Sequence, residues 1–401
     1  MDLDGPLRAF ASYSWTSTDD VTSVTDLVAE LRMRAFATFR DRDSLRPGAG
    51  IEASVHRQLA ASDVVVPYLT PYALASDPVV EMEFRTAAGL QRDHGRPRLM
   101  PILRNLGDDH ATVTAATYER LRYDFRARWT GQIAPAGDSP LPRELTARYA
   151  ADALRAALPE GAGPDSGRWR LMLATRGDRP APWPLTVDAT ELLGGDSQRP
   201  GDTETWQRLF AALCDLKTTL TRHGHRRDIE ICAACHLTAA IAAGYVFRGP
   251  TGWRIGAITA DGGVIRRSPS LIEQGLEFIP DFGAYTAAGG VLAVDIDLVP
   301  RHIERAVVRA LREPPRARLS VRRCDTGAHM DPRQFGTIAG AIAARIKHMR
   351  SELRATRIDL FLTAPAPLAL LLGAEFGAVG CPVRLHEHHD DEYVRSLDLP
   401  G

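Results

Sequence analysis

Strand-like and helix-like segments alternate along almost the whole of this sequence. Near the N-terminus, the apolar run 7–14 precedes a segment that Asp19 and Asp20 can cap, where apolar residues recur at the three- and four-residue spacing of an amphipathic helix. Further strands are expected at 35–39, 63–69 and 99–103, and further helices at 51–61, 80–90 and 145–158. Because such alternation produces a parallel sheet covered on both faces, the sequence predicts an α/β fold with functional loops at the carboxyl ends of its strands.

The chain has 401 residues, which exceeds what one hydrophobic core usually organises. Residues 159–167 (Pro-Glu-Gly-Ala-Gly-Pro-Asp-Ser-Gly) interrupt the pattern with a composition typical of a linker. We therefore expect one domain over 1–160, a linker at 161–166 and a second domain over 167–401.

The charge balance limits the partners of the chain. Lys and Arg total 49 and Asp and Glu total 50, so no global basic field exists to hold duplex nucleic acid. The N-terminus has no signal-peptide pattern, and the apolar runs are too short to cross a bilayer, so we expect a cytoplasmic protein without a membrane partner. Five cysteines, an odd number, indicate free thiols.

Two segments of the expected second domain echo each other. Residues 229–244 and 358–373 each read as a buried strand, a short turn and an Ala/Leu-rich helix that ends at Gly. The pattern alone leaves both a duplication and a chance similarity open. Each turn leads into a helix N-terminus, whose N–H groups and dipole attract anions. Arg176, His236 and Thr363 are near enough in the pattern to donate hydrogen bonds to a phosphate-rich ligand there.

Three segments of the first domain, 10–15 (Phe-Ala-Ser-Tyr-Ser-Trp), 39–48 (Phe-Arg-Asp-Arg-Asp-Ser-Leu-Arg-Pro-Gly) and 72–84, resemble the three sequence boxes of TIR domains in order and spacing. The resemblance covers about residues 7–160 and implies a flavodoxin-like domain with a parallel sheet. In the third box it places the catalytic carboxylate of an NAD⁺ glycohydrolase on Glu83, with Glu81 as the competing candidate.

The proposed reaction suits a single carboxylate. Nicotinamide leaves NAD⁺ as a neutral base while positive charge builds on the ribose, so one Glu can stabilise the transition state without a metal or a cofactor, and NAD⁺ is the substrate. Ser12, Tyr13, Trp15 and Asp43 are the expected NAD-binding residues. Many TIR domains are adaptors, and the alternative is a non-catalytic scaffold that recruits partners through the segment 40–50.

Two further motifs do not fit their usual chemistry. Gly48-x-Gly50-x-x-Ala53 follows the second strand rather than the first, which argues against a dinucleotide fingerprint and an NAD-dependent dehydrogenase. Cys232-x-x-Cys235-His236 matches the haem-attachment pattern, but such attachment takes place in exported proteins, and we expect no export of this chain. No metal site is expected.

Four segments of the second domain, 227–233, 236–240, 251–253 and 363–369, resemble SAVED domains. The resemblance covers about residues 167–401 and implies two fused CARF-like, Rossmann-like halves that bind a cyclic oligonucleotide. The expected binding residues are Arg176, Cys235, His236, Thr363, Ala364 and Pro365.

In this order the two domains resemble the TIR-SAVED effectors of CBASS antiphage defence. The resemblance implies that a cyclic oligonucleotide, for which we expect a cyclic trinucleotide such as cyclic triadenylate, activates hydrolysis of NAD⁺ to nicotinamide and ADP-ribose products. Ring size, base and linkage are not encoded in any motif of the chain. A ligand held between two SAVED surfaces makes a head-to-tail contact, which propagates into oligomers or filaments.

Overall fold

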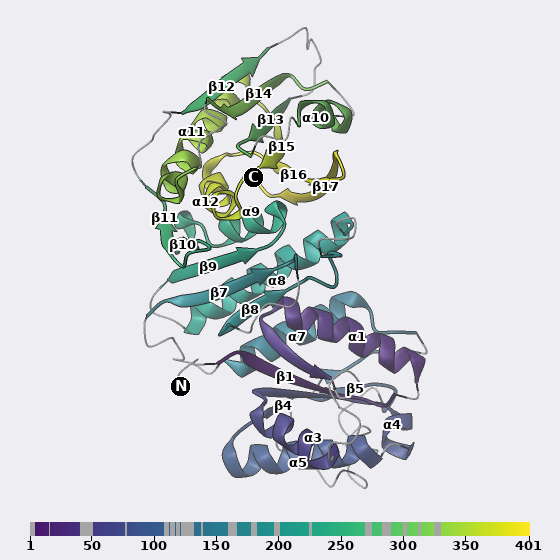
Figure 1. Cartoon of the computed structure of the whole chain (residues 1–401). Helices are drawn as coiled ribbons and strands as arrows, with labels where there is room; N and C mark the ends of the chain where they lie inside the picture. The colour runs from purple at the N-terminus through teal and green to yellow at the C-terminus, as the bar shows by residue number, and fades with distance from the viewer. Residues whose placement is uncertain are drawn as a thin grey trace. The chain divides into compact units, whose positions relative to one another are not determined.

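The computed structural model describes residues 5–15, 17–40, 51–76, 78–107, 112, 117, 121, 132–137, 139–158, 167–177, 183–195, 201–223, 227–268, 275–282, 290–299, 303–311, 314–324 and 330–401. The chain divides into two compact units (Figure 1). The first comprises 1–162 together with the short segments 184–187 and 218–223, and the second comprises the remainder.

The first unit is built on a parallel sheet with the strand order β2-β1-β3-β5-β6, in which β4 also pairs with β3. Helices α1 and α7 pack together on one face, and α3 and α5 pack together on the other (Figure 1). This arrangement confirms the predicted doubly covered parallel sheet. Its elements are β1 (Leu7–Ser12), α1 (Thr18–Met33), β2 (Phe36–Arg40), α3 (Ile51–Ala61), β3 (Val64–Leu69), α4 (Pro71–Ser76), α5 (Pro78–His94), β4 (Arg98–Leu99), β5 (Ile102–Leu103), β6 (Gln132–Ile133) and α7 (Arg143–Ala157).

Two local expectations for this unit were wrong. Helix α1 is capped by Ser17, whose hydroxyl accepts a hydrogen bond from the Asp20 backbone N–H at 3.2 Å, so the two aspartates lie in the first turn, where they favour the helix dipole. The strand expected at 99–103 is divided into β4 and β5, with Pro101 between them. Proline has no N–H to donate to the ladder, which explains the break.

The chain from residue 167 onward forms two sheets that repeat one topology; its segments 184–187 and 218–223 are the ones grouped with the first unit. The first has the order β11-β10-β9-β7-β8, and the second has the order β17-β16-β15-β13-β14, extended by β12. The elements of the first are β7 (Trp169–Ala174), β8 (Leu185–Asp188), α8 (Thr203–His223), β9 (Asp228–Ala234), α9 (Leu237–Val246), β10 (Arg254–Ile258) and β11 (Val264–Arg266). Those of the second are β12 (Leu276–Asp281), β13 (Val291–Asp297), α10 (Glu304–Ala310), β14 (Ala317–Arg323), α11 (Phe335–Leu353), β15 (Arg357–Thr363), α12 (Ala366–Glu375), β16 (Val383–His389) and β17 (Glu392–Leu399).

The two sequence echoes fall on equivalent elements of these sheets. One is β9 followed by α9, and the other is β15 followed by α12, and each strand is flanked by parallel neighbours. Because both halves also share the order of their other strands, the expected pair of fused Rossmann-like halves is confirmed as an architecture.

Helices α9 and α12 pack directly against each other (Figure 1). A Cβ placed on Gly244 would lie 1.9 Å from the Leu370 carbonyl oxygen, and one on Gly373 would lie 2.2 Å from the Ile241 carbonyl oxygen. The glycine that ends each echo therefore allows the two backbones to touch. The close approach lies in the C-terminal half of each helix, at Gly244 and Gly373.

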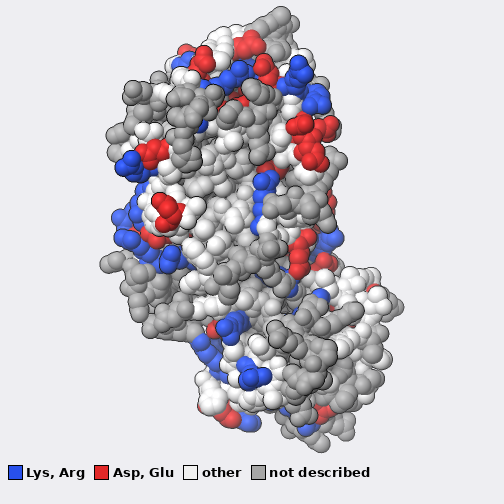
Figure 2. Space-filling model, in the orientation of Figure 1, with Lys and Arg blue, Asp and Glu red and all other residues white. Residues whose placement is uncertain are grey.

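The surface carries charges of both signs. On the face shown in Figure 2, the basic and acidic residues among those described are interspersed rather than gathered by sign. Within the described ranges, no helix combines the length and the apolar sequence that a membrane crossing requires.

Candidate functional site

The candidate catalytic carboxylate lies at the carboxyl end of β1. Ser12, the last residue of this strand, donates a hydrogen bond of 2.5 Å from its hydroxyl to Oε2 of Glu83, in the second turn of α5. Both side chains are buried, and Glu83 is only 2% exposed. A buried carboxylate requires hydrogen-bond donors, and the end of β1 supplies one.

The competing Glu81 occupies a different environment. Its carboxylate is a quarter exposed and pairs with Nη2 of Arg85, one turn along the same helix, at 2.7 Å. An ion pair of this kind on the outer face of a helix is a common surface feature. The geometry therefore favours Glu83 over Glu81 as the residue next to the strand end, and the catalytic role itself stays a prediction.

The other residues expected to bind NAD have different exposures. Ser12 and Tyr13 are buried at the end of β1, whereas the Trp15 side chain is 47% exposed and can offer its ring to a ligand. Asp43 and the rest of 41–50 lie outside the described residues. The structure therefore brings Ser12 and Glu83 together, and it places Tyr13 where its ring is covered by protein.

A pocket of about 280 Å³ lies at the same edge of the sheet, between the N-terminus of α1 and the ends of β3 and β5. Thr70 donates a hydrogen bond of 3.2 Å to Oδ2 of Asp20, and burial raises the pKa of this carboxyl. Arg104, also buried, donates to the Tyr68 hydroxyl at 3.0 Å. The TIR boxes do not include Asp20, Thr70 or Arg104; the only signal for them was their position after strands of a parallel sheet.

In the second unit, His236 immediately precedes α9 and is buried. The Thr175 hydroxyl accepts from the His236 backbone N–H at 2.8 Å and lies 2.8 Å from Nδ1 of the same residue. The Thr175 hydroxyl and Nδ1 thus form a buried hydrogen bond that fixes the orientation of the ring. Burial lowers the pKa of His236 to about 3, so this ring is neutral at pH 7.

An acidic side chain of the protein itself, that of Glu387, already occupies the first turn of α9. Glu387, from β16, accepts a hydrogen bond of 2.9 Å from the Thr238 backbone N–H and lies 3.6 Å from Nη2 of Arg176. Burial raises the pKa of Glu387. The two echoing turns are therefore not equivalent anion sites, because a carboxylate takes the place at α9 where we expected a phosphate. Cys235, beside it, is a buried free thiol whose pKa is raised by burial.

The corresponding turn at α12 borders a pocket. Thr363 ends β15 and donates from its hydroxyl to Oδ1 of Asp297 at 2.7 Å, while its carbonyl accepts from the Leu298 N–H at 2.9 Å. Ala364 and Pro365 form the turn, and Pro365 is the residue before α12. Beside this turn is a pocket of about 450 Å³, here called the α12 pocket, with lining residues Thr259, Ala260, Leu298, Val299, Arg323, Met330, Pro332, Phe335, Pro365 and Pro367.

The predicted binding residues thus fall into two groups. Pro365 lines the α12 pocket, with Thr363 and Ala364 directly before it in the chain, and Arg176, Cys235 and His236 surround the turn that Glu387 caps. Sequence reasoning missed the residues that close the α12 pocket from β10, β14 and α11, namely Thr259, Ala260, Arg323 and Phe335. In the sequence, these four residues are distinguished only by their positions, which follow a strand or begin a helix.

Comparison with known proteins agrees with this architecture. The profile of the TIR domain matches residues 10–134, and that of the SAVED domain, described as a "SMODS-associated and fused to various effectors sensor domain", matches residues 212–399. The fold and these two matches define a class of protein in which a sensor domain is fused to a second α/β domain. The chain is a TIR–SAVED fusion, with an N-terminal TIR domain and a C-terminal SAVED domain.

Among solved structures, the chain is similar to the Acinetobacter baumannii Cap4 SAVED/CARF-domain containing receptor with the cyclic trinucleotide 3'3'3'-cAAA, with 14% identity over 84% of this chain and 89% of that chain and a TM-score of 0.50. The same receptor with 2'3'3'-cAAA gives 14% identity, coverages of 85% and 90% and a TM-score of 0.50. At this identity the likeness establishes the fold. A comparison with curated proteins gave no match.

Proposed function

We propose that this chain is an NAD⁺ glycohydrolase that a cyclic oligonucleotide switches on, acting in the cytoplasm as a CBASS antiphage effector. The TIR domain cleaves the bond between nicotinamide and ribose, and the SAVED domain binds the activator. The single observation that carries the catalytic half of the proposal is the buried Glu83 carboxylate held by Ser12 at the carboxyl end of β1. NAD⁺ is the substrate, and the reaction needs no further cofactor.

The chemistry follows from where this carboxylate lies. As nicotinamide leaves with the electron pair of the C–N bond, positive charge develops on the ribose, and a carboxylate in a site that excludes water stabilises that charge strongly. Water then adds to the ribose carbon and loses a proton, which gives ADP-ribose. The exposed ring of Trp15 and the pocket beside Asp20 lie at the same edge of the sheet and supply surfaces for the rest of the dinucleotide.

Glu83 is buried in this state, which fits an enzyme that is silent before activation. A carboxylate that is 2% exposed cannot meet the ribose of NAD⁺ until neighbouring groups move. We propose that assembly supplies this movement, with the segment 40–50 of one TIR domain docking on the next to complete the site. The activator then acts by favouring the assembled state, to which it binds more tightly.

The α12 pocket is the proposed place for part of the activator. Its walls are largely apolar and include the Phe335 ring and three prolines, surfaces on which a nucleobase packs. Arg323 and the N-terminus of α12 lie at its border and favour a phosphate. The pocket is smaller than a whole cyclic trinucleotide, so the rest of the ring extends outside it. A second SAVED domain stacked head to tail would cover that remainder and build oligomers or filaments.

The decisive experiment measures nicotinamide release from NAD⁺ by the full chain, with no ligand, with 3'3'3'-cAAA and with 2'3'3'-cAAA. We expect cleavage only with an activating cyclic trinucleotide, accompanied by an increase in light scattering. Glu83→Gln removes the charge and keeps the shape, so it should lose cleavage by a factor of about 100 or more while it still assembles. Glu81→Gln is the matched control and should retain activity.

Each outcome has a definite meaning. Assembly with a cyclic trinucleotide but without nicotinamide release would support the non-catalytic scaffold instead. A fully active monomer would refute control by assembly. Loss of activity in Glu81→Gln with retention in Glu83→Gln would move the catalytic role to Glu81.

A further inference from the structure

A second pocket of the SAVED domain, here called the arginine pocket, has a volume of about 480 Å³ and lies over β15, β16 and β17 beside the end of α10. Val291 and Arg357, which begin β13 and β15, are part of its wall. The α12 pocket instead borders Leu298 and Pro365, which follow the ends of the same two strands. At about 3.3 Å per residue, the seven residue steps from Val291 to Leu298 place the two pockets roughly 20 Å apart.

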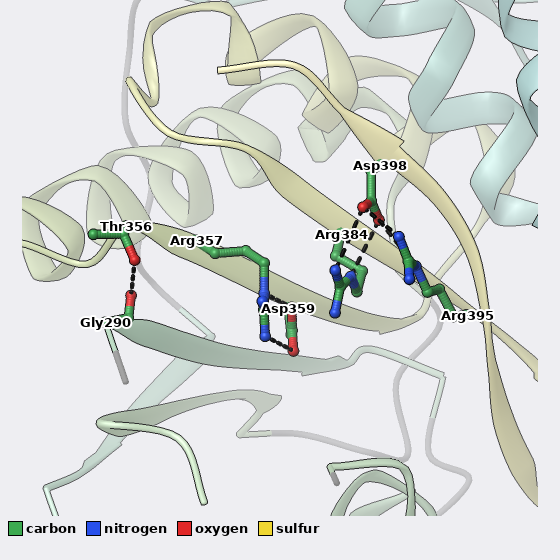
Figure 3. A network of polar contacts seen from close by, with 7 residues as sticks. All are labelled: Gly290, Thr356, Arg357, Asp359, Arg384, Arg395 and Asp398. Atoms are coloured by element: carbon green, nitrogen blue, oxygen red, sulfur yellow. Dashed lines mark hydrogen bonds and ion pairs between the residues drawn. The ribbon is translucent and has the colours of Figure 1, made fainter. Parts of the chain in front are cut away.

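Four arginines from four different elements line the arginine pocket: Arg309, Arg357, Arg384 and Arg395. Figure 3 shows that Arg384 and Arg395 flank the same carboxylate, that of Asp398. Arg384 Nε lies 3.2 Å from Oδ1, and Arg395 Nη2 lies 2.6 Å from Oδ2. One carboxylate thus serves two guanidinium groups, which leaves an excess positive charge.

The other two arginines differ in how they are neutralised. Arg357 donates from Nε to Oδ1 of Asp359 at 2.8 Å, and these charges balance (Figure 3). Arg309 donates from Nη2 to the Asp391 backbone carbonyl at 2.9 Å, a contact that neutralises nothing. With Glu392 as the other acid of the wall, the cluster keeps a net positive charge. Guanidinium N–H groups that face no acceptor within the described ranges remain for a ligand, among them Nη1 of Arg384 and Arg395.

A partly buried histidine adds hydrogen-bonding capacity to the same pocket. The His386 ring lines it and stacks on Phe361, with 4.3 Å between the ring centroids and 24° between the ring planes. Both ring nitrogens are buried, and in the described part of the chain neither has a hydrogen-bond partner. Buried polar atoms are nearly always satisfied in native proteins, so two such atoms in one ring beside a polar cavity indicate a missing partner.

We propose that the arginine pocket is a second ligand site, distinct from the α12 pocket, for a small molecule that carries a phosphate group. The planar guanidinium groups match the oxygens of a phosphate, and the His386 ring provides a hydrogen bond to it or to the group next to it. The same strands β13 and β15 connect this site to the α12 pocket, so occupation of one can influence the other.

The test uses the full chain and two probes, inorganic phosphate and adenosine 5'-monophosphate, in titration calorimetry. Both should bind without any cyclic nucleotide present, and acetate should bind more weakly. Arg395→Gln, a half-exposed position, should weaken phosphate binding by roughly tenfold or more, because a charge-assisted hydrogen bond is lost. Arg254→Gln removes a similarly ion-paired arginine on β10 and is the matched control.

Two further measurements keep the proposal falsifiable if Arg395→Gln folds poorly. His386→Phe preserves the stack on Phe361 and should weaken phosphate binding, and phosphate should shift the ring nitrogen resonances of His386 in protein with labelled histidine. Absence of phosphate binding by the unaltered chain would overturn the proposal, as would equal affinity in Arg395→Gln and Arg254→Gln. Because the α12 pocket is also proposed to favour a phosphate, the loss of affinity in Arg395→Gln and His386→Phe, and not phosphate binding alone, assigns the probe to the arginine pocket.

Discussion

Replacing Gly244 by Ala tests the close contact that joins the two halves of the SAVED domain. The added Cβ would lie 1.9 Å from the Leu370 carbonyl oxygen and 2.8 Å from the Ala374 backbone nitrogen. An ordinary carbon–oxygen contact is about 3.3 Å, so α9 and α12 would have to separate by roughly 1.4 Å. Because both obstacles are backbone atoms, no change of rotamer can relieve the clash.

The magnitude follows from two opposing effects. Overpacking in a fully packed region costs about 3 kcal/mol, partly because a gap of this size forfeits much of the dispersion attraction between the separated helices. Alanine in place of glycine inside a helix returns about 1 kcal/mol. We therefore expect Gly244→Ala to lower the free energy of unfolding by about 2 kcal/mol, which corresponds to a fall in Tm of roughly 4–8 °C for a domain of this size.

Thermal unfolding of the full chain, followed by tryptophan fluorescence, measures this change. Gly89→Ala in α5 is the matched control, because its Cβ would meet nothing closer than the end of Arg92 at 3.8 Å, and it should be neutral or stabilising. Gly373→Ala meets the Ile241 carbonyl and should resemble Gly244→Ala, while the double variant should cost less than the sum because the first Cβ already separates the helices. A Tm for Gly244→Ala equal to that of the unaltered chain would refute the reasoning.

Two other predictions concern the dependence of stability on pH and the binding of the activator. Burial lowers the pKa of His236 to about 3 and that of His386 to about 4, so below pH 6.5 each of these histidines binds more protons in the unfolded chain than in the folded chain, and the two together should lower the stability as the pH falls. At pH 5 the lowered pKa of His236 reduces the free energy of unfolding by about 2 kcal/mol. His236→Asn should therefore flatten the dependence of Tm on pH. His348→Gln, at an exposed position, should leave that dependence unchanged. Phe335→Ala should weaken binding of 3'3'3'-cAAA about tenfold in calorimetry, whereas Val308→Ala, on the exposed surface of α10, should leave it unchanged; equal affinities would place the base elsewhere.

The sequence predicted the class of each domain well. Hydrophobic periodicity is a local property of the chain, so the alternation of strand and helix, helix α3 over Ile51–Ala61 and both echoing strand-turn-helix segments could be read directly. The order of strands in the two SAVED sheets could not be predicted from the sequence, because it depends on which distant segments pair.

The candidate sites, like the strand order, depend on contacts between distant segments that the sequence alone does not reveal. The sequence already favoured Glu83 over Glu81 as the candidate carboxylate, and only the tertiary structure showed their different environments, by placing Ser12, 71 positions earlier, against Glu83 and Arg85 against Glu81. The echo suggested two equal anion sites, but Glu387, from a strand about 150 residues after the first turn, caps one of them and leaves the other beside a pocket. Burial and pairing arise from contacts between segments far apart in the chain, and these contacts decide which chemically suitable residues can act.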